Sequence, residues 1–412
     1  MARKSEKKAE DKKKGKLEHT SWEEMKKRGR LPKLKTREAD DKRIVIGITM
    51  GDPTGIGPEV IIKSLIDKSI RNRVIPIVFG DKGVLSKVAE DLGIRVRIRE
   101  LASVENIRQI EVDDKEIYVK SISNLKMTRL RYGRPDRNCG RAMVNYVKEA
   151  VDAWKQGIVE GIVTAPINKE IINEAGYRYG GHTEMLAELT GAKEFTMMFV
   201  SKHFKVSLVT IHLPLKDVSM RITPQRIYKV GLLSWKTLRE FFGIKNPRIG
   251  VCGINPHAGE GGMFGDEEKD MIYPAIVSMR AIGIDAEGPL SPDTAFWRAY
   301  NKEFDVIVAM YHDQGLIPVK LLDFDNAVNI TVGVPIVRTS PAHGTAYNIV
   351  GKGIADPSSM KSAINLAVDM ILVKKQIDSE RQKEQDRDMK KVEDEIKRYR
   401  ISEEEVREFI YT

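Results

Sequence analysis

Short apolar runs recur along the chain, and the segments between them have the spacing of amphipathic helices. Apolar runs of about four to eight residues are typical of buried strands. We predict strands at residues 44–50, 76–80, 116–123, 161–165, 204–211, 248–254, 306–310 and 328–332. Apolar positions three or four apart predict helices at residues 140–156, 223–243, 265–280 and from 360 to beyond 373. This alternation predicts an α/β fold with a largely parallel sheet.

Residues 306–320 place four polar side chains directly after an apolar run, 306–310, which we predict to be a buried strand. The four are Tyr311, His312, Asp313 and Gln314. Gly315 follows them, and we expect a turn there. In open α/β sheets, ligands bind beyond the carboxyl ends of the strands. This stretch is therefore the first candidate for a functional site.

Three of the seven histidines, His212, His257 and His312, follow predicted strands in the same way. A neutral imidazole is a common protein ligand for zinc, cobalt and similar ions. Three such ligands from three strand ends, with coordination positions left open, make a metal site of the catalytic type. The alternative is three unrelated polar loop residues. The rich polar context of all three loops favours the metal site.

His182 lies in the segment Gly180-Gly-His-Thr-Glu184, which allows two interpretations. The glycines, imidazole, hydroxyl and carboxylate suit a loop that binds a ligand. The same segment suits the start of a helix, with Thr183 as the N-cap and Glu184 in the first turn. The pattern alone leaves both open.

Lys320, Asn329 and Arg338 are further candidates for ligand contacts. The planar fork of donors on an arginine suits a carboxylate or a phosphate. Lys320 suits an anion, or a proton transfer if its pKa is lowered. For each residue taken alone, simple surface exposure is the competing explanation.

Two glycine-rich stretches fail the usual dinucleotide fingerprint. Residues 51–57 follow a predicted strand, but the position three beyond Gly57 is Val60. Residues 351–353 fail in the same way, so we do not expect an ordinary Rossmann site. Residues 342–348, with the sequence AHGTAYN, remain a candidate for holding a nucleotide through backbone donors.

The net charge of +10 is concentrated at the N-terminus, where residues 1–43 carry 17 Lys and Arg against 9 Asp and Glu. The rest of the chain is nearly neutral, so we do not expect a nucleic-acid footprint. We expect residues 1–43 to be a disordered basic tail; contact of this tail with RNA or acidic lipid is the weaker alternative. Residues 374–412, with 11 basic and 12 acidic residues, predict a charged helical extension.

Membrane insertion and secretion are also not expected. No apolar run approaches the roughly 20 residues that a membrane span needs. The charged N-terminus has no apolar core of a secretory signal. The two cysteines offer no disulfide framework, which fits a reducing cytoplasm.

A series of motifs resembles one enzyme family. In chain order these are MGDPTGIGPEV, APINKE, GGHTEMLAELTG, IHLPL, NPHAGEGGMFGDEE, GPLSPDTAFW, AMYHDQGLIPVK, VNITVG and RTSPAHGTAYNIVGKGIADP. Together they resemble the 4-hydroxythreonine-4-phosphate dehydrogenase family of pyridoxal phosphate biosynthesis, over residues 44–373.

The resemblance implies a fold like that of isocitrate and isopropylmalate dehydrogenases, with two α/β domains, a cleft between them and a homodimeric assembly. The cofactor-side domain would comprise residues 44–165 and 318–373. The metal- and dimer-side domain would comprise residues 166–317. The tail at 1–43 and the extension at 374–412 lie outside the usual core of the family.

The resemblance also assigns roles to residues. The metal ligands would be His212, His257 and His312, in a site completed across the dimer interface. The substrate-binding residues would be His182, Thr183, Lys320, Asn329 and Arg338. The cofactor loop would be His343, Gly344, Thr345 and Ala346. Lys320 and Asp313 are the candidates for the general base.

The implied reaction is an NAD-dependent oxidation of 4-phosphooxy-L-threonine, assisted by one divalent ion (zinc, cobalt or magnesium). The secondary hydroxyl becomes a ketone, and the resulting β-keto acid loses carbon dioxide to give 3-amino-2-oxopropyl phosphate. The alternative is a relative that acts on D-threonate or D-erythronate 4-phosphate in sugar-acid catabolism. A binding protein that uses the basic tail on nucleic acid is a hypothesis of a different class, which the balanced charge of the body disfavours.

Overall fold

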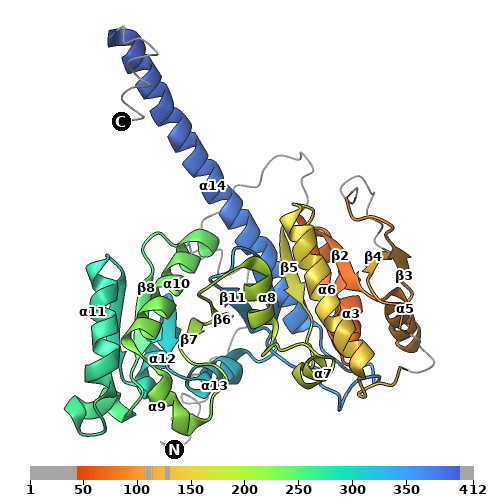
Figure 1. Ribbon diagram of the computed structural model, residues 1–412, viewed down its shortest axis with the longest axis horizontal. Coiled ribbons are helices and arrows are strands. Elements are labelled where there is room, and N and C mark those ends of the chain that lie inside the picture. The colour runs from red at the N-terminus through yellow and green to blue at the C-terminus, as the bar shows by residue number, and fades with distance from the viewer. Residues whose placement is uncertain (1–43, 106, 108–112, 114, 126–129, 400–412) are drawn as a thin grey trace, which may run out of the picture.

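The computed structural model describes residues 44–105, 107, 113, 115–125 and 130–399 (Figure 1). Within these residues one sheet of twelve strands runs through the molecule. Its strands are β1 (Ile44–Thr49), β2 (Val74–Gly80), β3 (Arg97–Glu100), β4 (Glu116–Ser121), β5 (Gly161–Thr164), β6 (Thr196–Val200), β7 (Lys205–Leu208), β8 (Arg248–Cys252), β9 (Asp285–Leu290), β10 (Val306–Ala309), β11 (Val328–Val332) and β12 (Val337–Pro341).

The order of strands in the sheet is β3-β4-β2-β1-β5-β12-β11-β6-β7-β10-β8-β9. Neighbours from β3 to β12 are parallel, and so are neighbours from β7 to β9. The three pairings in the middle, from β12 through β11 and β6 to β7, are antiparallel. The sheet is therefore two parallel blocks joined by an antiparallel centre, which confirms the predicted α/β class.

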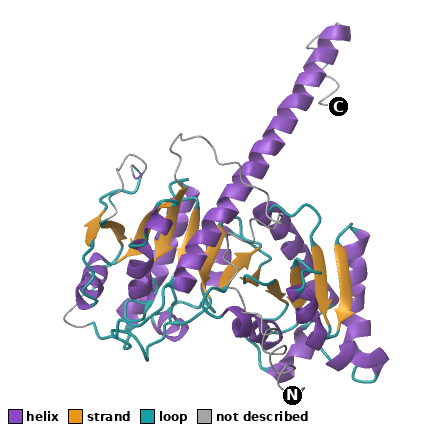
Figure 2. Ribbon diagram, turned by 180° about the vertical axis from the view of Figure 1, so that it is seen from behind, coloured by secondary structure: helices purple, strands orange, loops and turns teal. Residues whose placement is uncertain are grey.

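Helices lie on both faces of this sheet (Figures 1 and 2). The α-helices are α3 (Gly57–Leu65), α4 (Lys68–Arg71), α5 (Lys82–Asp91), α6 (Arg137–Lys155), α7 (Lys169–Glu174), α8 (His182–Thr190), α9 (Val218–Arg221), α10 (Pro224–Phe242), α11 (Tyr273–Ala281), α12 (Pro292–Tyr300), α13 (His312–Asp323) and α14 (Ser358–Tyr399). Three shorter helical segments are η2 (Leu215–Asp217), η3 (Pro256–Gly262) and η4 (Glu268–Ile272).

Local sequence explains where the long helices begin and end. The side chain of Asp136 accepts bonds from two backbone amides and caps α6. Thr223 caps α10 by accepting from the amide of Arg226, and Pro224 occupies the first turn as predicted. Gly243 ends α10 in the left-handed conformation, with φ of 68°.

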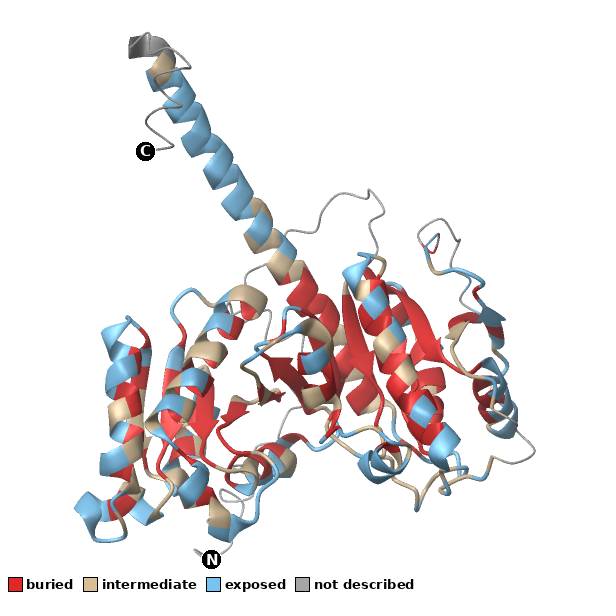
Figure 3. Ribbon diagram, viewed as in Figure 1, coloured by how far each residue is buried: buried red, intermediate tan, exposed pale blue. Residues whose placement is uncertain are grey.

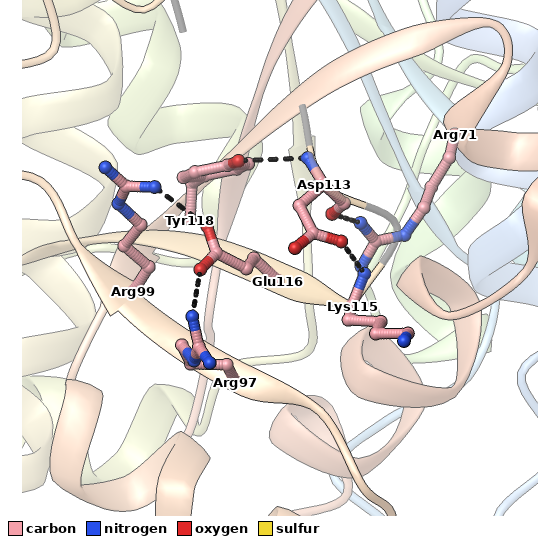
Figure 4. Close-up of polar contacts among 7 residues, drawn as sticks. All are labelled: Arg71, Arg97, Arg99, Asp113, Lys115, Glu116 and Tyr118. Atoms are coloured by element: carbon pink, nitrogen blue, oxygen red, sulfur yellow. Dashed lines mark hydrogen bonds and ion pairs between the residues drawn. The ribbon is translucent and has the colours of Figure 1, made fainter. Parts of the chain in front are cut away.

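The outer edge of the first parallel block is held by charged side chains (Figure 4). Arg97 and Arg99 on β3 each donate to the carboxylate of Glu116 on β4 at 3.0 Å. Arg71 donates to the carbonyl of Asp113 at 2.7 Å, just before β4 begins. Charges on an edge strand discourage pairing with a second sheet.

The structure corrects two details of the sequence prediction. Gly315 is not in a turn but inside α13, where a Cβ atom would come within 2.7 Å of Val206 on β7. The glycine is there because the helix packs closely on that strand. The helix predicted at 265–280 is divided into a π-helical turn, η4, and α11.

Strands β3, β6, β9 and β12 were not predicted. In β9 the sequence DAEGPL contains Gly288 and Pro289, which disfavour a strand interior. This sequence can form a strand because β9 lies at the edge of the sheet, where among the described strands it pairs with β8 alone. The domain division at residues 165 and 318 stays a prediction, and the tail at 1–43 lies outside the described residues.

The C-terminal helix α14 has two unlike halves (Figure 3). Its first half packs on the sheet and buries residues such as Met360, Ile364 and Ile371. Residues 381–395 are all exposed, and the helix projects from the body as a charged rod. This agrees with the helical extension predicted from residue 374; residues 400–412 lie outside the described part. None of the described helices is long and apolar enough to cross a membrane.

We expect deletion of residues 381–412 to leave the body of the protein intact. Residues 381–395 bury no side chain, so their removal should shift the melting temperature by less than ~2 °C. Ile364→Ala is the contrasting variant, because Ile364 is 1% exposed and its truncation should cost about 2–5 kcal/mol. Thermal unfolding of the three proteins checks this. A truncated chain as unstable as Ile364→Ala would contradict it.

Candidate active site

The pairing of β7 with β10 brings His212 and His312 together. The backbone ladder continues beyond both strands, because Thr210 donates to the carbonyl of Met310 at 3.1 Å. Two residues later on each chain segment, the rings of His212 and His312 lie with their centroids 5.7 Å apart. Parallel neighbours end at the same edge of a sheet, which is why the two imidazoles meet.

Each of these imidazoles has a charged neighbour. Asp313 lies 2.6 Å from Nδ1 of His312, through Oδ1, and can orient that ring. The amine of Lys169, the first residue of α7, lies 3.5 Å from Nδ1 of His212. Burial, followed by the charges of Lys169 and His312, lowers the pKa of His212, so this imidazole is neutral and able to bind a cation.

His257 does not join this pair within one chain. It lies in η3, where the five residues 257–261 have positive φ angles, and its side chain is 63% exposed. Its ring contacts the carboxylate of Glu260 and the edge of Phe264. Among the described residues, no three His, Cys, Asp or Glu side chains are grouped so as to hold a metal ion.

The loop that carries His257 is nonetheless firmly built. The carboxylate of Glu268, 6% exposed, accepts from the backbone amides of Ile254 and Asn255 at 2.8 Å. It also accepts from the side-chain amide of Asn255 at 3.0 Å. The loop therefore has a defined shape that presents His257 to the outside.

Arg338 places a buried cation in the middle of the sheet. It is 2% exposed, and within the described part of the chain its guanidinium donates to hydroxyls alone: to Thr164 at 2.7 and 3.1 Å and to Thr331 at 3.1 Å. No described carboxylate lies within ion-pair distance of it. Burial lowers its pKa to about 9, which leaves it charged at neutral pH. A buried charge without a partner is costly, so this guanidinium is suited to an anionic ligand.

Two unpaired polar atoms belong to other predicted ligand-binding residues. Nε2 of His182 and Oδ1 of Asn329 are buried without a hydrogen-bond partner. Burial, and then the charges of Arg338 and Lys169, hold the pKa of His182 well below its usual value, so the ring is neutral. Buried polar groups are nearly always paired, and those left free mark places where a ligand can bond.

The segment 180–184 begins a helix, α8, as one of its two interpretations predicted, but with a different N-cap; its role in ligand binding stays a prediction. The helix begins at His182 and its N-cap is Gly181, so Thr183 is a buried first-turn residue and not the cap. Glu184 lies in that first turn, as expected. Its charge partly offsets the lowering of the pKa of Arg338 and of His212 by burial, so this carboxylate lies near both groups.

Lys169, Thr164 and Thr331 are thus residues around the site that the sequence did not single out as ligand contacts. The available signal was their place in the segments APINKE, GIVTA and VNITVG, directly at strand ends or in the sheet. Without the tertiary structure, nothing in those segments says which residue faces inward.

Lys320 lies two turns beyond His312 on α13. Eight helical residues span about 12 Å along the axis, so the two side chains belong to different parts of the site. The amine of Lys320 lies 5.9 Å from the ring of Phe324. Its charge adds to burial in lowering the pKa of His343, which places Lys320 on the side of residues 343–346.

The predicted cofactor loop packs against the glycine-rich turn after β1. The amide of Ile56 donates to the carbonyl of Thr345 at 3.1 Å. Gly55 suits this close approach, because a Cβ atom there would lie 3.1 Å from Thr345 and the loop would have to move slightly to admit it. Nε2 of His343 is buried without a partner, so the loop offers an open bonding position. The glycine-rich turn at residues 51–57, which lacks the dinucleotide-binding pattern, thus packs against residues 343–346 and supports them.

This two-block α/β sheet, with imidazoles beyond its strand ends and a buried guanidinium within it, suits an enzyme that binds a small anion. Comparison with known proteins makes this specific. Residues 72–367 match the family described as pyridoxal phosphate biosynthetic protein PdxA. The chain belongs to this family, as the motif series predicted, and it is a dehydrogenase, an oxidoreductase.

Individual relatives cover the same part of the chain. A 4-hydroxythreonine-4-phosphate dehydrogenase from Sulfurihydrogenibium sp. is 42% identical over 81% of this chain and 100% of its own. A D-threonate 4-phosphate dehydrogenase from Cupriavidus necator is 44% identical over 79% of this chain and 97% of its own. The crystal structure of 4-hydroxythreonine-4-phosphate dehydrogenase from Klebsiella pneumoniae has a TM-score of 0.73 at 38% identity, covering 80% and 99% of the two chains.

We expect the stability of the metal-free protein to fall as the pH drops below about 6.5. The folded-state pKa of His182 is lowered, so the unfolded state binds more protons there and gains at acidic pH. A His182→Gln variant lacks this titration and should lose less stability between about pH 7.5 and about pH 5.5. Denaturant midpoints at both pH values measure the difference, with His257→Gln, which removes an exposed ring, as the control. Equal losses in wild type and His182→Gln would contradict the prediction.

Proposed function

We propose that this chain oxidises 4-phosphooxy-L-threonine with NAD and decarboxylates the product to 3-amino-2-oxopropyl phosphate, in pyridoxal phosphate biosynthesis. The observation that carries this proposal is the buried, unpaired guanidinium of Arg338 near neutral His182 and the imidazole pair, in a chain of the PdxA family. The name of the Sulfurihydrogenibium relative supports the substrate.

The donor set fits a divalent ion. His212 and His312 offer two imidazoles with centroids 5.7 Å apart, and His212 is held neutral by burial. Imidazoles suit zinc or cobalt, and magnesium would need added oxygen ligands. When bound, the ion supplies Lewis-acid stabilisation of the developing alkoxide, and the nicotinamide supplies the hydride acceptor.

We propose that the third imidazole is His257 of the partner subunit in a homodimer. The exposed apolar side chains that support this lie beside the histidines themselves. Met263 and Phe264, on the His257 loop, are 75% and 47% exposed. Ile317 and Leu321, on α13 beyond His312, are 65% and 81% exposed. In a twofold dimer, one surface patch meets its own copy, so each loop can reach the other subunit's pair.

Each residue of the site then has its own role in binding or in chemistry. Arg338, Asn329, His182 and Thr183 bind the anionic and polar groups of the substrate, and Lys320 adds a second cation. Asp313 orients His312 and, with Lys320, stays a candidate for the general base. Oxidation converts the secondary hydroxyl to a ketone β to the carboxylate. The bond to the carboxylate then breaks, its electrons pass to the ketone, and carbon dioxide leaves. Residues 343–346 would hold the NAD.

A second candidate is the oxidation of D-threonate or D-erythronate 4-phosphate. The Cupriavidus relative supports it, because its identity of 44% equals that of relatives named for the amino-acid substrate. The two substrates share a phosphate, a carboxylate and the oxidised hydroxyl. They differ in whether an amino group or a hydroxyl lies beside the carboxylate.

The activity is tested on a panel of three acids: 4-phosphooxy-L-threonine, D-threonate 4-phosphate and D-erythronate 4-phosphate. With NAD and a divalent ion we expect NADH absorbance, fastest with 4-phosphooxy-L-threonine and abolished by EDTA. Arg338→Lys should lower kcat/KM by about 10²-fold, because a point charge replaces a planar fork that makes three hydrogen bonds. Absence of NADH with all three acids would refute the proposal.

The shared site is tested by mixing subunits. His212→Ala and His257→Ala homodimers should each be inactive. A dimer of one His212→Ala subunit and one His257→Ala subunit has two unlike sites. One site lacks both His212 and His257, and the other has all three histidines. An equimolar co-expression should therefore recover about a quarter of wild-type activity. Co-expression of His212→Ala with His312→Ala is the matched control and should recover none, because both ligands come from one subunit. Recovery in the control, or none in the first mixture, would contradict the proposed geometry.

A further inference from the structure

A buried set of hydrogen bonds joins three loops at the strand ends of the first parallel block. The loops are residues 51–57, 166–168 and 343–347. The centre of this set is Asp52, which follows β1 and is fully buried. Oδ1 of Asp52 accepts from the amide and the hydroxyl of Thr54, both at 2.8 Å. Oδ2 accepts from the hydroxyl of Tyr347. No described cation lies within ion-pair distance of this carboxylate, so these hydroxyl and amide donors are what balance its burial.

Tyr347 extends the link to the metal side. It directly follows residues 343–346, and its hydroxyl accepts from the side-chain amide of Asn168 at 2.7 Å. The carbonyl oxygen of the same Asn168 side chain accepts from the amide of Ile171 at 3.1 Å and so caps α7. The first residue of α7 is Lys169, whose amine contacts His212. The phenol thus connects the candidate cofactor loop to the start of α7, the helix whose Lys169 contacts the imidazole pair.

Backbone bonds hold the same three loops in register. The amide of Asp52 donates to the carbonyl of Pro166 at 2.8 Å, and the amide of Ile56 donates to that of Thr345 at 3.1 Å. Gly51 has φ of 71°, and a Cβ atom there would lie 2.4 Å from the carbonyl of Pro166. The backbones therefore approach closely, and the Tyr347 hydroxyl is the side-chain bridge between them.

We propose that Tyr347 is a positioning residue for the dinucleotide. Its hydroxyl sets the conformation of residues 343–346 relative to the start of α7, so that the bound cofactor faces the imidazole pair. This rests on the proposed function, in which residues 343–346 hold NAD. Removal of the hydroxyl leaves Oδ2 of Asp52 and the amide of Asn168 without their partner inside the protein. Both groups then turn to other partners or to water, and the loop shifts.

Tyr347→Phe tests this, because the ring and its packing remain. We expect the KM for NAD to rise about tenfold, which corresponds to ~1.4 kcal/mol, while the KM for the phosphorylated acid stays within about twofold. The dissociation constant of NAD, measured by calorimetry without the acid, should rise by a similar factor. Asp52→Asn should act in the same direction, because asparagine has one acceptor oxygen in place of two and cannot accept from both Thr54 and the Tyr347 hydroxyl.

Tyr118→Phe is the control. Tyr118 lies on β4 and is fully buried, and its hydroxyl accepts from the backbone amide of Asp113 at 3.2 Å, away from the three loops (Figure 4). Tyr118→Phe should lower stability and leave the KM for NAD unchanged. If Tyr347→Phe loses stability alone, with NAD affinity as in wild type, the link is merely structural and the proposal is wrong.

Failure of the Tyr347 proposal can be distinguished from failure of the proposed function. If wild type binds NAD but forms no NADH from any of the three acids, the proposed function fails, and the calorimetric comparison still decides the role of Tyr347. If wild type binds no NAD, both proposals are overturned.

Discussion

A guanidinium buried without an ion pair among the described residues is the feature on which the rest of the site depends. Arg338 lies on a central strand, and the described hydrogen-bond partners of its guanidinium are threonine hydroxyls on the neighbouring strands β5 and β11. Burial of an unpaired ion costs several kcal/mol, and an anionic ligand that pairs with it would offset this cost. Nε2 of His182 and Oδ1 of Asn329, which have no hydrogen-bond partner among the described residues, offer further bonding positions, and Oδ1 requires a donor on the ligand.

The geometry of the sheet decides what lies around this guanidinium. The parallel pairing of β7 with β10 brings His212 and His312 together, while the antiparallel centre carries Arg338 and Asn329 on β12 and β11. The firmly built loop of His257 points outward from the same half of the molecule. A single chain therefore brings two of the three candidate imidazoles together. In the homodimer that we propose, the exposed apolar residues on the His257 loop and on α13 face the second copy, whose His257 supplies the third.

Much of the fold was predictable from local chemistry. Apolar runs gave eight of the strands, and Thr223 with Gly243 marked both ends of α10. The errors have physical reasons. Gly315 was interpreted as a turn, although its lack of a side chain serves the packing of α13 on β7. The strand β9 was missed because glycine and proline are rare in strand interiors, and only its place at the edge permits them.

The sequence by itself determined the class of fold, the family and the residue types at the site, because hydrophobic period and motif order are local properties of the chain. Only the tertiary structure decided which of those residues meet. It joined His212 to His312 but not to His257, placed Lys169 and Glu184 beside them, and bound Tyr347 to Asp52 across 295 positions. Such contacts depend on strand order and register, which no short stretch of sequence encodes.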